Sequence, residues 1–362
     1  MNAEPRLASL RRQMADDSLP AMLITGVSNM RYLTGFESVF DSGINAACLV
    51  TREIARFYTD RRYSEAATAE AEGTPWAVRV PEESLYIDAC AELREGGVTE
   101  LALESSIPYG RFKFISEQFL GSVRVRDHMV EEIRQVKGAH ELERIEAAAK
   151  LTDRAFDHIL GMIVPGMTER EVALELEFYM RRNGSDDIAF DPIVASGPNS
   201  ARPHAGVSDR VIGSGEFLKL DFGARIDGYC SDMTRTVVMG VASERHREIY
   251  EAVYAANAVG VAAVRSGVTG KDIDAAARQS LVAAGFAEYF THGLGHGVGL
   301  DVHEMPTLGQ RSQDSLRTGA VVTIEPGVYI PGFGGVRIED LVVVEERGGR
   351  VLSSSPRDLI EI

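Results

Sequence analysis

The sequence predicts an α/β (α+β) chain of two domains, the second of which contains an internal pseudo-twofold repeat. Three observations support this prediction. Short apolar segments alternate with helical ones up to residue 128, a charged segment follows at 131–138, and the remainder contains two similar helix starts. We place the boundary within 130–140 and define the domains as 1–132 and 133–362. A chain of 362 residues has room for two such domains.

The first domain has the pattern of strands alternating with helices. Its candidate strands are short, apolar and rich in β-branched or aromatic side chains. The expected strands are 21–25, 46–51, 55–59 and 101–104, and the expected helices are 61–72 and 83–93. No phosphate-binding or dinucleotide-binding fingerprint occurs here, so we interpret the domain as structural or dimerising. The alternative is that four of its residues lie near the site of a partner subunit: Asn29, Arg31, Tyr32 and Asp41.

The second domain repeats a helix–helix–strand pattern. Thr168 begins a helix with a capping box to Glu171, and a comparable start occurs at 267–272. A segment with a histidine follows each helix, His204 in the first copy and His303 in the second. A long amphipathic helix precedes each start, at 141–163 and at 244–265. A duplicated unit would bring both histidine segments to one cleft, and the alternative is that the two helix starts are similar by chance.

The stretch 291–303, Thr-His-Gly-Leu-Gly-His-Gly-Val-Gly-Leu-Asp-Val-His, has glycine at alternate positions in its middle. Each of these glycines would cost a helix about 1 kcal/mol. We therefore expect an extended or looping segment, and not a helix that holds zinc between His292 and His296. Alternate glycines let backbone and ligands approach closely, which makes these histidines candidate ligands or catalysts. The alternative is a glycine-rich turn with incidental histidines.

Four carboxylates interrupt apolar β segments. Asp221 lies in Phe-Leu-Lys-Leu-Asp-Phe-Gly, and Asp232 lies on the expected partner strand beyond the turn at 225–228. Glu325 closes one apolar run, and Glu339 enters another. Aspartate is disfavoured within strands, and a buried charge without a partner is costly. These acids therefore require a cation.

Two kinds of cation can meet that requirement. Arg235 or Arg337 could neutralise any single acid, which is the alternative to a metal site. Four acids on separate strands, together with His296, are harder to neutralise with arginine. Four carboxylates and one imidazole suit Mn²⁺, Co²⁺ or Fe²⁺ better than structural zinc. Four negative charges match two divalent ions, which can share and activate a hydroxide.

Composition and charge narrow the classes of function. The net charge of −16 argues against binding to nucleic acid or to an anionic membrane. The three separated cysteines, Cys48, Cys90 and Cys230, indicate a reducing compartment and no disulfide framework. The sequence has neither a signal-peptide pattern nor an apolar run of about 18 residues, so we expect a cytoplasmic protein that does not span a membrane.

At these acids and histidines the chain resembles the pita-bread metallopeptidases, the family of Xaa-Pro aminopeptidase (aminopeptidase P), prolidase, methionine aminopeptidase and creatinase. The matching motifs are Leu-Asp-Phe-Gly, Ser-Asp-Met-Thr-Arg-Thr, Gly-His-Gly-Val-Gly-Leu, Ile-Glu-Pro-Gly-Val-Tyr and Val-Arg-Ile-Glu-Asp. The resemblance includes a creatinase-type N-terminal domain. It implies that Asp221 chelates one metal and that Asp232 and Glu339 bridge both. His296 and Glu325 would complete the coordination of the other metal ion, and Glu325 would also exchange a proton with the bridging water.

The resemblance also assigns roles to supporting residues. His204, His292 and His303 correspond to family histidines that bind the substrate carbonyl and stabilise the tetrahedral intermediate. Arg337, two residues before Glu339, would orient that carboxylate. We interpret the remaining histidines as surface residues: His128, His140, His158 and His246.

The function implied by the resemblance is hydrolysis of the bond before proline in short peptides, with two divalent ions, Mn²⁺ first and Co²⁺, Zn²⁺ or Fe²⁺ as alternatives. Many prolidases have an arginine after His-Glu-x-Pro, where this chain has Thr307, although Arg311 could replace it. We therefore favour an aminopeptidase P-like enzyme over an Xaa-Pro dipeptidase (prolidase). A homodimer is expected, and the alternative from another class is a non-enzymatic pita-bread binding protein.

Overall fold

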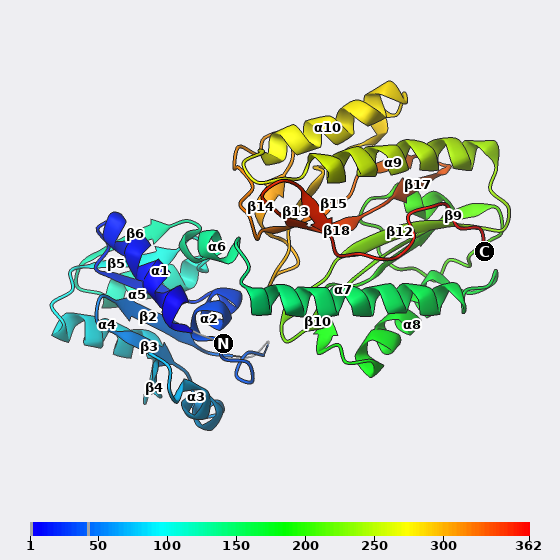
Figure 1. The fold of residues 1–362 in the computed structure, drawn as a ribbon. Coiled ribbons are helices and arrows are strands. Elements are labelled where there is room, and N and C mark those ends of the chain that lie inside the picture. The colour runs from blue at the N-terminus through cyan, green and yellow to red at the C-terminus, as the bar shows by residue number, and fades with distance from the viewer. Residues whose placement is uncertain (1–2, 42–43) are drawn as a thin grey trace. The chain divides into compact units, whose positions relative to one another are not determined.

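The computed structural model describes residues 3–41 and 44–362. The chain divides after Arg134 into two compact units (Figure 1), whereas the sequence places the boundary between 132 and 133. In the part of the chain that is described, no helix combines the length and the hydrophobicity that crossing a bilayer requires.

The N-terminal unit is a mixed sheet accompanied by helices. Its strands are β1 (Ala21–Ile24), β2 (Ala47–Thr51), β3 (Ala55–Tyr58), β4 (Ala77–Arg79), β5 (Glu100–Glu104) and β6 (Ser122–Arg126). Its helices are α1 (Ala3–Asp16), α2 (Val27–Thr34), α3 (Ser64–Ala71), α4 (Leu85–Glu95), α5 (Tyr109–Gln118) and α6 (Met129–Arg134). The strand order is β4-β3-β2-β1-β5-β6, and β2 runs antiparallel to both of its neighbours. The α/β pattern predicted for this segment is confirmed.

Two residues considered for a partner's site have a structural role within this unit. Asn29 and Tyr32 are both buried. Asn29 Nδ2 donates hydrogen bonds to Glu104 Oε1 and to Glu131 Oε1, each at 2.7 Å. The Asn29 amide therefore connects α2 to β5 and α6, and its polarity is explained by hydrogen bonds inside the unit.

The C-terminal unit contains two helix pairs with strands between them. The first half comprises α7 (Ala139–Leu160), α8 (Glu169–Arg182), β7 (Asp187–Ile188), β8 (Ile193–Ser196), the 3₁₀ helix η1 (Gly197–Ala201), β9 (Glu216–Phe222), β10 (Ala224–Ile226), β11 (Tyr229–Cys230) and β12 (Met233–Met239). The second comprises α9 (Glu244–Ala263), α10 (Gly270–Ala283), η2 (Ala287–Tyr289), β13 (Gly295–Gly297), β14 (Glu304–Leu308), β15 (Val321–Ile324), β16 (Gly327–Ile330), β17 (Gly334–Arg337), β18 (Asp340–Val344) and β19 (Gly349–Val351).

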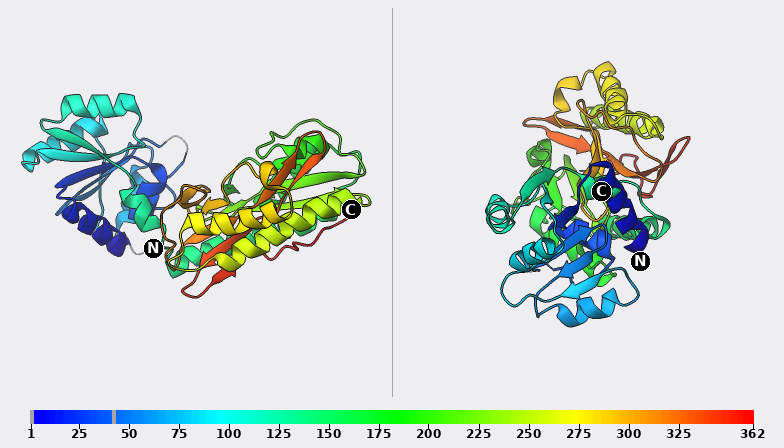
Figure 2. Two further views of the ribbon diagram at one scale, coloured as in Figure 1. Left: turned by 90° about the horizontal axis from the view of Figure 1, so that it is seen from above. Right: turned by 90° about the vertical axis from the view of Figure 1, so that its left-hand side faces the viewer.

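The two halves show the duplication that the sequence predicts. Helices α7 and α8 lie on one side of the strands and α9 and α10 on the other (Figure 1), and the end-on view of Figure 2 shows the yellow pair outside the orange strands. Thr168 accepts a hydrogen bond from the Glu171 N–H at the start of α8, and Thr269 accepts one from the Asp272 N–H at the start of α10. The pita-bread architecture is thus confirmed.

The interpretation of His246 as a surface residue is wrong. His246 is only 5% exposed, and its Nδ1 accepts a hydrogen bond from the Ser243 N–H at 3.2 Å at the start of α9. Its ring centroid lies 4.5 Å from that of Phe217 and 5.1 Å from that of Phe333. Position on a helix did not reveal this burial, because the two aromatic rings come from distant strands and their connections.

The glycines of the histidine stretch are required by close strand packing. Strand β13 lies between β14 and β15, which confirms the extended conformation expected for this stretch. A Cβ on Gly295 would lie 2.1 Å from the Thr323 carbonyl oxygen, and one on Gly297 would lie 2.2 Å from the Met305 carbonyl oxygen. Neither backbone neighbour can move without disturbing the sheet that carries His296.

Gly297→Ala should therefore lower the free energy of unfolding by about 2 kcal/mol or more, because its methyl group overlaps backbone atoms. The matched control is Gly348→Ala, whose Cβ would have no neighbour within 4 Å in the described chain and whose φ is not positive. This control should change stability by less than about 0.5 kcal/mol. Urea unfolding of both variants measures the difference, and equal stabilities would contradict the packing argument.

Candidate metal centre

One pocket of about 510 Å³ in the C-terminal unit contains every residue that the sequence singles out as ligand or catalyst. These residues are His204, Asp221, Asp232, His292, His296, His303, Glu325, Arg337 and Glu339. Three further residues of the lining, which the sequence analysis missed, are Phe190, Asp191 and Ile193. The structure therefore brings together side chains that are up to 135 positions apart in the chain, from His204 to Glu339.

The two aspartates come from the β9–β12 hairpin. Asp221 lies near the end of β9, opposite Thr234 in the antiparallel register. The sequence analysis placed Asp232 on the partner strand. In the structure Asp232 directly precedes β12, so it lies just before the strand and not within it. Both side chains are buried. The hairpin therefore presents two carboxylates to the same space.

The two glutamates come from the ends of strands in the second half. Glu325 directly follows β15, and its N–H donates to the Leu294 carbonyl at 2.9 Å. Glu339 connects β17 to β18, and its N–H donates to the Thr234 carbonyl at 3.0 Å. This last bond joins the second half to β12 of the first, so the acids of both halves meet at the junction of the repeat.

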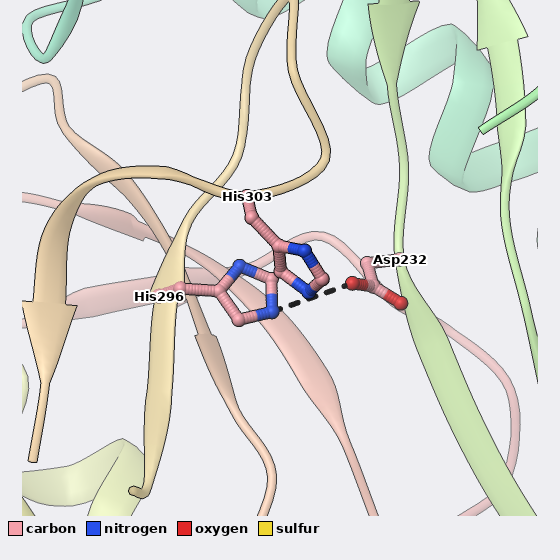
Figure 3. A group of neighbouring side chains, drawn as sticks. All are labelled: Asp232, His296 and His303. Carbon is pink, nitrogen blue, oxygen red and sulfur yellow. Dashed lines mark ion pairs between the residues drawn. The ribbon is translucent and has the colours of Figure 1, made fainter. Parts of the chain in front are cut away.

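The imidazole of His296 is oriented towards these acids. Its Nδ1 lies 3.1 Å from the Gly297 carbonyl oxygen, an arrangement that suits an Nδ1–H donor and leaves the Nε2 lone pair facing the pocket. Nε2 lies 3.6 Å from Asp232 Oδ2 and 3.3 Å from Glu325 Oε1. Figure 3 shows His296 and His303 projecting together towards Asp232, with ring centroids 4.2 Å apart.

Several carboxylate oxygens in the pocket are buried without a hydrogen-bond partner in the described part of the chain. They are Asp221 Oδ1, Asp232 Oδ1 and Glu339 Oε1. A buried, unsatisfied lone pair is costly, so its presence indicates a ligand. Three groups have donor atoms within 4.8 Å of one another: Asp221–Asp232–Glu339, His296–Glu325–Glu339 and Asp232–His296–His303. The residues therefore fit divalent cations, and the third group admits His303 as a ligand in addition to its expected role at the substrate.

The protonation of the acids responds to burial and to mutual repulsion. Burial, reinforced by the charge of Glu339, raises the pKa of Asp232 well above its usual range. Burial also raises the pKa of Glu339, with Glu325 adding to the effect, and that of Asp221. Burial is the largest influence on Glu325 and opposes its ionisation, but the hydrogen bond and charge of His296, together with the charges of Arg337 and His292, outweigh burial and lower the Glu325 pKa to about 2. Full ionisation of the cluster therefore requires added positive charge.

Arginine does not supply that charge to every acid. Arg337 donates to Asp221, but among the described residues Asp232 and Glu339 have no arginine in ion-pair contact, and Arg235 pairs with Asp340 at 2.8 Å. Arg337 was expected to orient the Glu339 carboxylate, but the two side chains are connected through a third one, that of Thr234. Arg337 Nε donates to Thr234 Oγ1 at 2.9 Å, and this hydroxyl donates to Glu339 Oε2 at 2.6 Å.

Tyr329 connects Arg337 to His292, a role that the sequence analysis missed. The Tyr329 hydroxyl accepts from Arg337 Nη1 at 2.9 Å and lies 2.9 Å from His292 Nε2. Burial raises the pKa of Tyr329 to about 12, so the hydroxyl keeps its proton at neutral pH. The sequence contained a signal for both connecting residues, because each lies in one of the matching motifs. Tyr329 ends the Ile-Glu-Pro-Gly-Val-Tyr motif, and Thr234 lies two residues after Asp232.

Comparison with known proteins places this geometry in a family. The profile of Metallopeptidase family M24 matches residues 143–346. The chain belongs to this family. A second profile, the Creatinase/Prolidase N-terminal domain, matches residues 6–136. The M24 chain is therefore a hydrolase, and its family together with the acidic cluster implies divalent metal ions.

Individual relatives cover nearly the whole M24 chain. An uncharacterized peptidase of Bacillus subtilis is 42% identical, over 98% of this chain and 99% of its own. An Xaa-Pro dipeptidase of Pyrococcus horikoshii is 37% identical, over 96% of each chain. Among solved structures, an Xaa-Pro dipeptidase from Bacillus anthracis has a TM-score of 0.94 at 38% identity, with 100% of both chains covered. An X-Pro aminopeptidase from Thermotoga maritima has a TM-score of 0.88 at 34% identity, with 98% of this chain and 99% of its own chain covered.

The raised pKa values predict how metal and pH affect stability. The folded metal-free protein holds protons on Asp232 and Glu339 that the unfolded chain releases near pH 4, so its stability should fall as the pH rises above that value. Divalent ions bind the ionised acids and remove this penalty. The difference in Tm between Mn²⁺-loaded and EDTA-treated protein should therefore grow from about pH 5 to about pH 8.

The control for this prediction separates the cluster from surface acids. Asp232→Asn should raise the Tm of the EDTA-treated protein and reduce the gain from Mn²⁺. Asp209→Asn, which removes an exposed partner of Arg170, should leave that gain unchanged. A gain from Mn²⁺ that is the same at every pH would contradict the assignment of these acids as ligands.

Proposed function

We propose that the protein is a dinuclear metallopeptidase that hydrolyses the peptide bond preceding proline in short peptides. The observation that carries the proposal is the meeting of four carboxylates and His296 in one pocket, with unpartnered buried oxygens on three of the acids. Relatives named for Xaa-Pro substrates, at 34–38% identity over nearly the full chain, support the substrate class.

We assign the metal ligands by the motif each acid occupies and by its place in the pocket. Asp221 would chelate one ion, and Asp232 and Glu339 would bridge both. His296 and Glu325 would complete the coordination of the other ion. The mostly carboxylate donor set favours Mn²⁺, with Co²⁺, Zn²⁺ or Fe²⁺ as alternatives. Bound divalent ions polarise the scissile carbonyl and lower the pKa of the attacking water.

The side chains of the pocket would move protons and hold the substrate. The Glu325 carboxylate, which lines the pocket beside His296, would take a proton from the attacking water and pass it to the proline nitrogen. Burial lowers the pKa of His292 and of His303, so both imidazole rings are neutral at neutral pH. His204 and His303, on exposed segments at the pocket, would donate to the substrate carbonyl as negative charge develops.

The charge of the pocket favours the aminopeptidase P-like activity. Among the described residues that line it, Arg337 is the only lysine or arginine, and its guanidinium already donates to Asp221, Thr234 and Tyr329. Arg311, the candidate substitute for the missing prolidase arginine, is exposed and does not line the pocket. A dipeptide carboxylate would therefore lack a cationic partner in this lining, whereas a longer peptide places its carboxylate outside the pocket.

Xaa-Pro dipeptidase is the second candidate. It is favoured by the names of the relatives from Pyrococcus horikoshii and Bacillus anthracis, which align with nearly the full chain. A homodimer and a cytoplasmic location complete the proposal. The resemblance to the family supports the first, and three buried cysteines that form no disulfide support the second.

Hydrolysis of Gly-Pro, Gly-Pro-Pro and Arg-Pro-Pro by the Mn²⁺-supplemented enzyme tests this function. The tripeptides should be cleaved before the first proline with kcat/KM at least about tenfold above that for Gly-Pro, a difference of about 1.4 kcal/mol in transition-state binding. The reverse order would identify an Xaa-Pro dipeptidase. Asp232→Ala should abolish cleavage, and activity that survives this substitution would refute the dinuclear site.

Tyr329→Phe tests the hydrogen bonds that hold His292 and Arg337. It removes one hydroxyl while preserving the ring, so kcat/KM should fall by about tenfold, with metal content unchanged. Tyr250→Phe is a matched control, because its hydroxyl is bound to the Arg357 and Asp358 carbonyls, away from the pocket. Equal kcat/KM for Tyr329→Phe and the wild type would show that this bridge has no part in catalysis.

A further inference from the structure

A buried lysine lies beside the metal-ligand candidates without being one of them. Lys219 precedes Asp221 by two positions on β9 and is fully buried. The flanking Leu218 and Leu220 belong to the apolar core of the first half, so Lys219 shares the opposite, site-facing side of the strand with Asp221. The sequence Phe-Leu-Lys-Leu-Asp thus places an ammonium where an apolar residue would be expected.

The Lys219 ammonium holds the segment that precedes His204. Nζ donates to three carbonyl oxygens of this segment, those of Ser200 at 3.3 Å, Arg202 at 2.6 Å and Pro203 at 3.1 Å. One amino group thus serves three acceptors on one short stretch of backbone. The bonds end at the residue directly before His204.

The connection is held on both sides of His204, and Lys219 acts on the side before it. Beyond His204, the Ser208 hydroxyl donates to Glu169 Oε2 at 2.5 Å, and the Ser208 carbonyl accepts from the Arg170 N–H at 3.1 Å. Residues 202–210 form neither helix nor strand. Upstream, the Ser200 hydroxyl accepts from the Gly335 N–H at 2.9 Å, which attaches the end of η1 to β17. Nearer to His204, Arg337 Nη1 donates to the Pro203 carbonyl at 3.1 Å. On the side before His204, Lys219 is thus the side chain that binds three carbonyl groups, of which the one at Pro203 also accepts from Arg337.

The cost of burying this charge indicates a role beyond packing. No carboxylate of a described residue lies in ion-pair contact with Lys219, although the charge of Asp221 acts on it and the Tyr329 ring centroid lies 5.1 Å from Nζ. Burial, reinforced by the charge of Arg337, lowers the pKa of Lys219 well below its usual range, so this polar side chain is expensive here compared with an apolar one of the same length, such as methionine. Such a group is retained where it fixes a geometry that an apolar residue would not.

We propose that Lys219 is a positioning residue that fixes the His204 segment at the pocket through the carbonyls of Ser200, Arg202 and Pro203. Its effect on catalysis rests on the proposed function, because it acts through the contact of His204 with the substrate. The positioning itself does not depend on that function. Lys219 touches neither the substrate nor the metals in this proposal.

The first test observes His204 directly. Histidine ring ¹H–¹³C spectra are recorded for Lys219→Met, with and without Zn²⁺, and the His204 cross-peak is identified by its loss in His204→Ala. Lys219→Met should move or broaden the His204 cross-peak and leave that of His246 in place. Val237→Ala is the matched control: Val237 is buried on β12 opposite Leu218, so its truncation should lower the Tm and leave the His204 cross-peak unchanged.

The second test is a double-mutant cycle on kcat/KM with Arg-Pro-Pro. Lys219→Met should lower kcat/KM by about tenfold or more at unchanged metal content, since misplacing one contact in a site is costly. In the His204→Ala background, the same substitution should change kcat/KM by less than about twofold. If Lys219→Met does not fold, Lys219→Gln replaces it in both tests, because its shorter side chain ends in one oxygen and two N–H donors and cannot bond to all three carbonyl oxygens.

The outcomes separate this proposal from the proposed function. An unchanged His204 cross-peak in Lys219→Met, or in Lys219→Gln if that variant is used, would overturn the proposal whatever the activity. Equal losses of kcat/KM with and without His204 would also overturn it, since Lys219 would then act through another group, such as Asp221. A wild-type enzyme that cleaves no proline peptide would refute the proposed function alone, and the spectra would still decide the role of Lys219.

Discussion

The burial of several carboxylates in one pocket is the constraint on which the rest of the C-terminal unit depends. Each acid raises the cost of ionising its neighbours, and burial adds to that cost, so Asp232 and Glu339 resist losing their protons. The surrounding groups oppose this repulsion. His296 faces Glu325, Arg337 donates to Asp221, and the Thr234 hydroxyl joins the arginine to Glu339. The remaining negative charge is what makes the pocket suited to divalent ions.

The duplication of the helix–helix–strand unit makes this concentration of charge possible. Asp221 and Asp232 come from the first half, whereas His296, Glu325 and Glu339 come from the second. Each half alone would bury only part of the donor set. The strands approach closely enough to assemble it because glycines flank His296 in β13, at 295 and 297, where a Cβ would meet neighbouring backbone. Charge placement and strand packing are therefore two aspects of one arrangement.

Buried lysines also accompany the histidine segments of both halves. Lys219 binds the carbonyls before His204. In the second half, Lys137 Nζ donates to Glu304 Oε1 at 2.6 Å, and Glu304 directly follows His303. Both ammonium groups are buried, yet one is compensated by carbonyl dipoles and the other by a carboxylate. Lys137 therefore holds the first residue of β14, whereas Lys219 holds a connection that lacks the ladder hydrogen bonds of a strand.

The sequence by itself determined the α/β pattern, the duplicated unit and the acids and histidines that meet in the pocket. It could do so because strand and helix periodicities are local, and because acids in apolar strands and glycines beside histidines conflict with ordinary packing. Only the tertiary structure decided which partner each group has. The path from Arg337 through Thr234 to Glu339, the contacts of Tyr329 and the burial of His246 all join residues distant in sequence, whose meeting depends on strand register and packing and not on local propensity.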